Sequence, residues 1–253
     1  MATPKVFIVT GASKGIGAAV VQYLLGQSHK VVLSARSQDL LEKVKQTHPS
    51  QVEFIAGDMA SPDIAQKLTD LAVTSFGKID GLVINHGVLQ PQKLDTATIE
   101  DIRHLYDINF FSYLAIAKAS LKELKKSKGS IVWVSSGAAV KAYVSWGAYS
   151  SSKAAINLIS QGLAAEEPDI TSIAIAPGRV DTEMQALIRS QGKESMDEAQ
   201  YDSFVKAFEE GALLKPEQPG HVMAKFVSDP QHDLSGKFLS WNSPELAAYQ
   251  AEV

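Results

Sequence analysis

The sequence predicts a single-domain α/β fold: a doubly wound parallel sheet of about seven strands, with helices on both faces and a small helical lid. Short β-branched apolar runs alternate with segments of helical periodicity along the chain. A glycine-rich turn follows the first run, and polar residues recur where later runs end. With 253 residues and 45% hydrophobic content, the chain can bury one core of this size, so residues 1–253 are expected to form one domain.

The first expected strand, residues 5–10, is followed at once by the glycine-rich turn and then by the helix-like run A-A-V-V-Q-Y-L-L-G. Three glycines have the spacing G-x-x-x-G-x-G, and a residue without Cβ lets backbone amides and a helix N-terminus approach a pyrophosphate. Glycines also serve plain turns, but the strand before and the helix after favour dinucleotide binding in a Rossmann-type fold. The turn residues expected to contact the cofactor are Gly11, Ser13, Lys14, Gly15, Ile16 and Gly17.

The second expected strand, residues 30–34, ends in A-R-S. An NAD-binding chain usually carries an acid near this point for the ribose 2′-hydroxyl, whereas this chain has Arg36. Together with Lys14 it supplies two cations for a 2′-phosphate, which favours NADP as the cofactor. The alternative is that both are ordinary exposed cations. Asp39 is expected inside the next helix.

Two further strands are expected at residues 51–57 and 80–85. The first ends at Asp58, whose carboxylate is expected either at the adenine edge, with Met59 beside it, or at a helix N-cap. The second ends in N-H-G, which places Asn85 and Gly87 at the carboxyl end of a parallel strand, where ligand sites of α/β proteins collect. His86 has no evident catalytic partner and is interpreted as a packed loop residue.

A long helix is expected from about residue 97 to 126, with Asn109 as its polar exception. A buried amide needs partners and distorts a helical hydrogen-bond ladder, so this residue marks either a function or a helix–helix contact. The fifth strand, residues 130–135, delivers Ser136 at its carboxyl end. Another helix follows from about residue 148 to 166.

Tyr149 and Lys153 stand at positions i and i+4 of this helix and therefore share one face. At about 4 Å and an effective dielectric of about 20, their charges interact by about 4 kcal/mol, enough to bring the phenol pKa toward neutrality. Such a phenol is an efficient general acid, and Ser136 is placed to bond the same substrate oxygen. The alternative interpretation of a Tyr-x-x-x-Lys pair is a solvated helix face.

The sixth strand, residues 171–176, leads into P-G-R-V-D-T. Its exit loop is expected to contact the nicotinamide end of the cofactor through Pro177, Gly178, Val180 and Thr182, although an ordinary loop would look the same. Residues 183–214 break the strand–helix rhythm and are interpreted as a substrate lid, or else as a surface helical hairpin. A helix over 219–227 and a strand over 237–240 complete the sheet.

The composition excludes several classes of function. Net charge is −4 without a basic block, which argues against nucleic acid as a partner, and the absence of cysteine excludes disulfides and thiol catalysis. The six histidines show no metal-ligand spacing, so no metal is expected. Without a signal-peptide layout or an apolar run of about 18 residues, we expect a cytoplasmic protein that does not enter the membrane.

Five motifs occur in the order found in the short-chain dehydrogenase/reductase family, which the chain therefore resembles: T-G-A-S-K-G-I-G, N-H-G, I-N-F-F-S, V-S-S-G and Y-S-S-S-K. The resemblance implies a catalytic set of Ser136, Tyr149 and Lys153, with Asn109 as fourth member holding a water that relays protons to the lysine. It also implies a homodimer or homotetramer through the helices around 97–126 and 148–166. The family's N-N-A-G motif is altered, with Ile84 for its first Asn and His86 for its Ala.

More narrowly, the run from Ser135 to Asn157 and A-P-G-R-V-D-T-E-M-Q resemble the sepiapterin-reductase-like branch and its fungal benzil reductases. This implies NADPH-dependent reduction of a 1,2-diketone to a chiral hydroxyketone. The alternatives are an oxidoreductase for secondary alcohols, steroids or ketoacyl groups, and a non-catalytic NADP-sensing protein. An apolar wall for a hydrophobic carbonyl substrate is expected from Val140, Tyr143, Val144, Trp146, Met184, Leu187 and Phe204, which could equally be core residues or dimer contacts.

Overall fold

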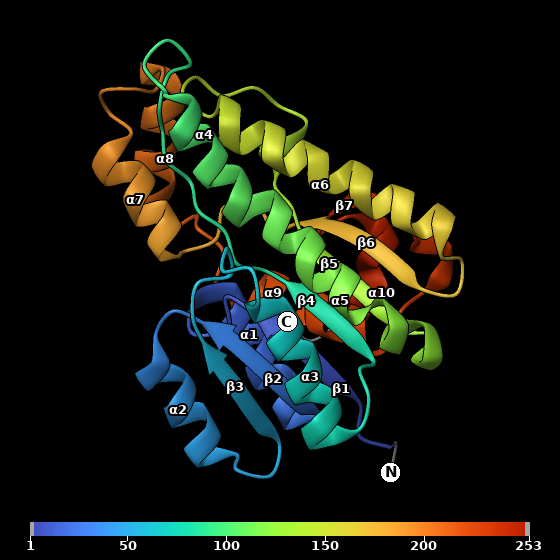
Figure 1. Ribbon diagram of the computed structural model, residues 1–253. Helices are drawn as coiled ribbons and strands as arrows, with labels where there is room; N and C mark the ends of the chain where they lie inside the picture. The colour runs from blue at the N-terminus through green and yellow to red at the C-terminus, as the bar shows by residue number, and fades with distance from the viewer. Residues whose placement is uncertain (1–2, 251–253) are drawn as a thin grey trace.

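The computed structural model describes residues 3–250, so the first two and last three residues of the predicted domain lie outside it. Seven strands form one sheet: β1 Val6–Thr10, β2 Lys30–Ala35, β3 Val52–Ala56, β4 Gly81–Ile84, β5 Ser130–Val134, β6 Thr171–Ala176 and β7 Phe238–Ser240. Their order is β3-β2-β1-β4-β5-β6-β7, and every neighbouring pair is parallel (Figure 1). The predicted doubly wound parallel sheet is therefore confirmed.

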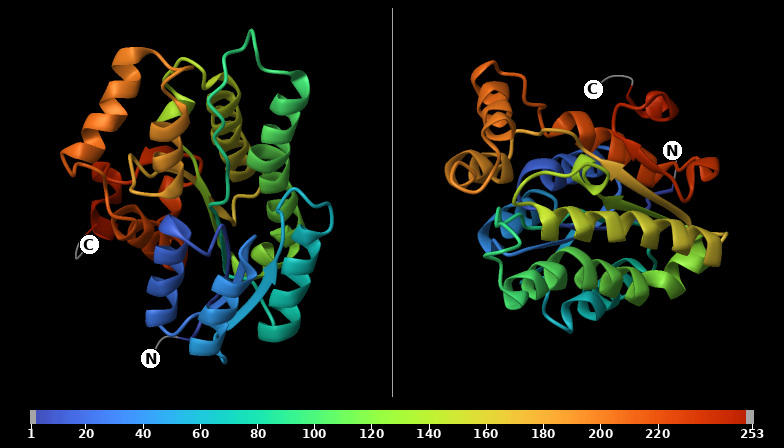
Figure 2. Two further views of the ribbon diagram at one scale, coloured as in Figure 1. Left: turned by 90° about the vertical axis from the view of Figure 1, so that its left-hand side faces the viewer. Right: turned by 90° about the horizontal axis from the view of Figure 1, so that it is seen from above.

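Helices cover both faces of this sheet (Figure 2). One face carries α1 Gly15–Gly26, α2 Gln38–Thr47, α9 Glu217–Ser228 and the short α10 Ala247–Gln250, and the other carries α3 Ile64–Phe76, α5 Ser112–Ser127 and α6 Gly147–Glu166. Alternate residues of β1 enter the two layers: Phe7 and Val9 pack toward α1 and α9, whereas Val6 and Ile8 pack toward α3 and α5. Because both faces are covered, the strands are continuous apolar runs.

The predicted long helix over 97–126 is interrupted. Thr98 begins α4, Ile99–Tyr106, with a capping box to Asp101, and a π-helical turn at Asp107–Phe111 then separates α4 from α5. Asn109 lies inside this turn and is fully buried. A π-helical turn adds one residue to the helix and so changes the direction in which its side chains point.

The segment predicted as a lid forms two helices, α7 Glu183–Gln191 and α8 Glu198–Glu209. They contact each other beyond the carboxyl end of the sheet and are drawn in orange in Figure 1. Their inward residues Ile188 and Phe204 join a third apolar cluster with Trp146 and Tyr149. Across residues 3–250, no helix combines the length and the apolarity needed to cross a membrane.

Candidate active site

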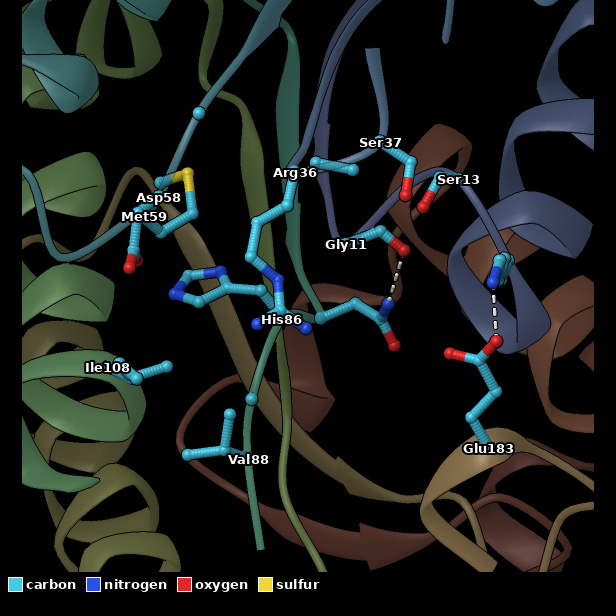
Figure 3. Close-up of a pocket in the computed structure, with 15 residues that line it drawn as sticks. Gly11, Ser13, Arg36, Ser37, Asp58, Met59, His86, Val88, Ile108 and Glu183 are labelled. Atoms are coloured by element: carbon cyan, nitrogen blue, oxygen red, sulfur yellow. Dashed lines mark hydrogen bonds and ion pairs between the residues drawn. The ribbon is translucent and has the colours of Figure 1, made fainter. Parts of the chain in front are cut away.

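A cavity of about 220 Å³ opens at the carboxyl end of the sheet (Figure 3). It lies near the point where β1 and β4 are neighbours and the strand order of the sheet reverses. We call it the cofactor cavity, after the cofactor that the sequence predicts at these residues. The glycine turn and the ends of β2, β3 and β4 surround it. Its lining includes the expected residues Gly11, Ser13, Lys14, Arg36, Asp58, Met59, Asn85 and Gly87, and further Ala35, Ser37, Gly57, His86, Val88, Ile108 and Glu183.

The glycine turn leaves no room for a side chain at Gly11 or Gly17. A Cβ on Gly17 would lie 2.2 Å from the Gly11 carbonyl oxygen, and Gly11 itself has φ +62° and would clash with Asn85 Nδ2 at 2.9 Å. The Asn85 amide holds the turn by donating to the Gly11 carbonyl at 3.1 Å. The start of α1 has no side-chain cap, so its backbone amides are left for another acceptor. This cradle fits the pyrophosphate of a dinucleotide.

Two cations line the cofactor cavity, and they differ in their partners. Lys14 forms an ion pair with Glu183 at the start of α7 (Figure 3). Arg36 is exposed at the end of β2 and makes no ion pair with any residue of the range 3–250. Asp58 closes a turn by accepting from the Ala60 amide at 3.0 Å, and the N-cap of α3 is Asp63, so Asp58 does not take the alternative N-cap role.

A second cavity of about 220 Å³ lies under the lid, and we call it the substrate cavity. Its aromatic wall consists of Tyr143 stacked on Trp146 at 4.8 Å and Phe204 of α8 at 5.4 Å from Trp146. Met184 also lines it, whereas Leu187 packs behind it. The expectation for Val140 and Val144 is wrong, because the loop before α6 turns both to the surface, where they are 72% and 43% exposed.

Ser136 and Tyr149 both line the substrate cavity. Ser136 follows β5, and its Oγ accepts a hydrogen bond from the Ala138 amide at 3.1 Å. The proton of the Ser136 hydroxyl is therefore left for a different acceptor. Tyr149 is only 6% exposed on the first turns of α6. Burial raises the pKa of its phenol above the ordinary value, and the neighbouring Ser136 hydroxyl opposes that rise.

Lys153 lies one turn further along α6 and is almost completely buried. Its Nζ donates to the Val134 carbonyl at 2.8 Å and to the Tyr113 hydroxyl at 3.0 Å, and burial lowers its pKa to about 7. The sequence predicted that this ammonium lowers the pKa of Tyr149 directly, and in this structure that is wrong. The i, i+4 spacing places Tyr149 and Lys153 on one face of the helix, but the lysine amino group donates its hydrogen bonds to acceptors on β5 and α5.

The side chain of Asn109 extends from the π-helical turn toward the region around Gly87 and Lys153. Its Oδ1 accepts from the Val88 amide and its Nδ2 donates to the Val88 carbonyl, both at 2.9 Å. A Cβ built on Gly87 would lie 3.3 Å from Asn109 Oδ1 and 3.6 Å from Lys153 Nζ. The segment after β4 thus brings Gly87, Asn109 and Lys153 together and borders both cavities.

His86 is confirmed as a packed loop residue. Its Nε2 lies 2.6 Å from Ser112 Oγ, which donates to the Ile108 carbonyl, and its Nδ1 lies 2.7 Å from Thr10 Oγ1. Both ring nitrogens are therefore satisfied with the proton on Nε2. Burial, with the Lys153 charge second, lowers the pKa of His86 to about 3, so the ring is neutral.

The loop after β6 closes the site from the opposite side. A Cβ on Gly15 would lie 3.0 Å from Thr182 Cγ2, so this loop packs on the glycine turn. Pro177, Gly178, Val180, Thr182 and Ile16 all line the substrate cavity. The sequence interpretation did not identify further residues of this cavity, since apolar loop residues carry no motif: Leu89, Ser135, Gly137, Ala138, Arg179, Gln185 and Ile188.

Comparisons with known proteins give matches over most of this chain. A family model described as short chain dehydrogenase matches residues 5–193. The uncharacterized oxidoreductase YIR035C of Saccharomyces cerevisiae is 40% identical over 97% of this chain and 98% of its own length. Its crystal structure superimposes with a TM-score of 0.94, covering 97% of this chain and 99% of that one. Benzil reductase ((S)-benzoin forming) IRC24 of the same yeast is 34% identical over 97% of this chain and 99% of its own length.

Proposed function

Because the chain belongs to the short-chain dehydrogenase/reductase family of oxidoreductases, we propose that it is an NADPH-dependent reductase of hydrophobic ketones or 1,2-diketones. One observation carries the proposal. Ser136 and Tyr149 line an apolar cavity, and the segment after β4 borders both this cavity and the cavity with the glycine cradle.

The residues of the cofactor cavity fit NADP. The glycine turn and the uncapped start of α1 suit the pyrophosphate, and Arg36, with no acidic partner in the described part of the chain, suits a 2′-phosphate. Ser13 and Ser37 line the same part of the cavity and add hydroxyl donors. When bound, the reduced nicotinamide supplies a hydride for the carbonyl carbon.

Tyr149 is proposed as the general acid. Since burial raises its pKa, the phenol is protonated at neutral pH and able to give its proton to the carbonyl oxygen. Ser136 donates a second hydrogen bond to that oxygen, and Lys153, in its charged form, would donate to the nicotinamide ribose of the bound cofactor and so help to orient the hydride.

The substrate cavity supports an aromatic carbonyl compound. Tyr143, Trp146 and Phe204 offer ring faces, and among the polar residues of the lining we assign Ser136 and Tyr149 to orient one oxygen. A relative described as a (S)-benzoin-forming benzil reductase supports a 1,2-diketone as substrate. The product would be a chiral hydroxyketone.

The test is the loss of NADPH absorbance with benzil, followed by chiral analysis of the product. Tyr149→Phe should abolish turnover and leave NADPH binding, measured by fluorescence titration, nearly unchanged. Turnover at the wild-type rate in this variant would remove the phenol from the mechanism. NADPH binding without oxidation across a panel of diketones, ketones and steroids would instead favour an NADP-sensing protein.

A homodimer through α4 and α6 is also proposed. Leu94, Ile99, Phe111 and Leu158 are each more than half exposed, although they are large apolar side chains on or beside these helices. An apolar groove runs between α4 and the start of α6 beside three of them. Light scattering of the wild type and of Leu158→Glu should show a dimer and a weakened dimer respectively, and a monomeric wild type would contradict the proposal.

A further inference from the structure

A second phenol, Tyr113 of α5, is in direct contact with Lys153. The Tyr113 ring is fully buried, and its hydroxyl oxygen lies 3.0 Å from Lys153 Nζ. The amino group also sits over the Tyr113 ring, 4.7 Å from its centroid. The lysine therefore meets the phenol both at its hydroxyl and at its face.

The Tyr113 hydroxyl has two backbone carbonyls within reach, those of His86 at 2.5 Å and Val134 at 3.4 Å. It donates its proton to the nearer one, His86, which leaves the oxygen lone pairs for the lysine. The ring itself packs between His86, at 4.7 Å between centroids, and Trp133, at 6.4 Å. Since a phenol has few rotatable bonds, this packing holds the acceptor in place.

Lys153 has little else to hold it. Within residues 3–250, its hydrogen-bond acceptors are the Tyr113 hydroxyl and the Val134 carbonyl. The titratable groups facing it are Tyr113 from α5, His86 from the end of β4 and Tyr149 from its own helix, and it forms no ion pair with a described carboxylate. An ammonium buried in this way depends on neutral acceptors for its charge.

We propose that Tyr113 is a positioning residue for Lys153: its fixed hydroxyl holds the amino group, in its charged form, beside Gly87 and Asn109 before any ligand binds. The role of the lysine in turnover rests on the proposed function, but the contact does not. Tyr113 acts only through Lys153 and needs no contact with cofactor or substrate.

The test compares Tyr113→Phe with the wild type, free of ligand. Losing the acceptor should destabilise the charged amine more than the neutral one, so the pKa of Lys153 falls further below about 7. The stability lost in Tyr113→Phe should then be greater at pH 6, where the wild-type lysine is charged, than at pH 9, where it is neutral in both proteins. Urea unfolding at the two pH values measures this difference without any reaction.

The matched control is Tyr106→Phe on α4, whose hydroxyl makes no hydrogen bond within the described range, and its effect on stability should be independent of pH. If Tyr113→Phe showed the same loss at pH 6 and pH 9, the hydroxyl would serve packing alone and the proposal would be overturned. An unfolding midpoint too low to measure at pH 6 but normal at pH 9 would support it.

Turnover gives a second measurement. In the proposed reductase, kcat/KM is expected to decrease at high pH as Lys153 loses its charge. In Tyr113→Phe this alkaline limb of the pH profile should move to lower pH by about one unit, because the lysine loses its charge at a lower pH. An unchanged limb together with a pH-dependent stability loss would support the contact and refute the role of the Lys153 charge in turnover. An unchanged limb and a pH-independent loss would overturn both.

Discussion

The side chain of Asn109 pairs with the backbone of Val88 through two reciprocal hydrogen bonds of 2.9 Å each. A side-chain amide thus takes the place that a neighbouring strand would take in a sheet. The pair joins the π-helical turn to the segment after β4 and fixes the position of Gly87 between the two cavities.

Asn109→Leu should therefore cost about 2–4 kcal/mol of unfolding free energy, because the Val88 amide and carbonyl lose their partners in a buried place. The same variant should lower kcat/KM, since Gly87 and Lys153 lose a common neighbour. Urea unfolding measures the first effect. Asn242→Leu, at an exposed turn after β7, is the control and should change stability by less than about 0.5 kcal/mol.

Gly17→Ala should abolish NADPH binding. The new Cβ would lie 2.2 Å from the Gly11 carbonyl oxygen, so the turn must open and the start of α1 must move. Gly26→Ala in the same helix meets no atom within 4 Å and should leave binding unchanged, with a small gain in stability. Fluorescence titration with NADPH measures both, and normal binding by Gly17→Ala would show that the cradle does not hold the cofactor.

Arg36→Ala should weaken NADPH binding by about ten- to a hundredfold and leave NADH binding nearly unchanged, as expected for the loss of about 1.5–3 kcal/mol of charge-assisted hydrogen bonding. The reason is that Arg36 lines the cofactor cavity without an acidic partner in the described range. Arg103→Ala on the exposed side of α4 is the matched control. Equal losses for the two nucleotides would exclude a 2′-phosphate contact.

The low pKa of His86 predicts that the folded protein loses stability in acid. Its pKa is about 3 in the folded protein and about 6.5 when unfolded, so between these values only the unfolded state binds the proton. Stability should therefore fall as the pH drops below about 6.5, by up to about 1.4 kcal/mol per pH unit from this group. The slope should be smaller in His86→Asn than in the wild type, and urea unfolding between pH 7 and pH 4 measures it.

Much of this protein follows from local sequence. The glycine spacing, the β-branched runs and the polar residues after them predicted the parallel sheet, its helical layers and the residues lining the cofactor cavity. Apolar residues with a period of two or of 3.6 show which face of a strand or helix is buried. The residue that follows a parallel strand lies at the carboxyl edge of the sheet. The i, i+4 spacing of Tyr149 and Lys153 likewise set their common face.

The tertiary structure alone decided what those side chains touch. Lys153 binds acceptors on β5 and α5 rather than Tyr149, Glu183 reaches across to Lys14, and Val140 and Val144 turn outward. Such partners are distant along the chain or depend on one loop conformation, so no local pattern encodes them. Sequence spacing determines from which face of an element a side chain starts. The packing of the other elements determines which acceptor lies within about 3 Å of the polar group at its tip.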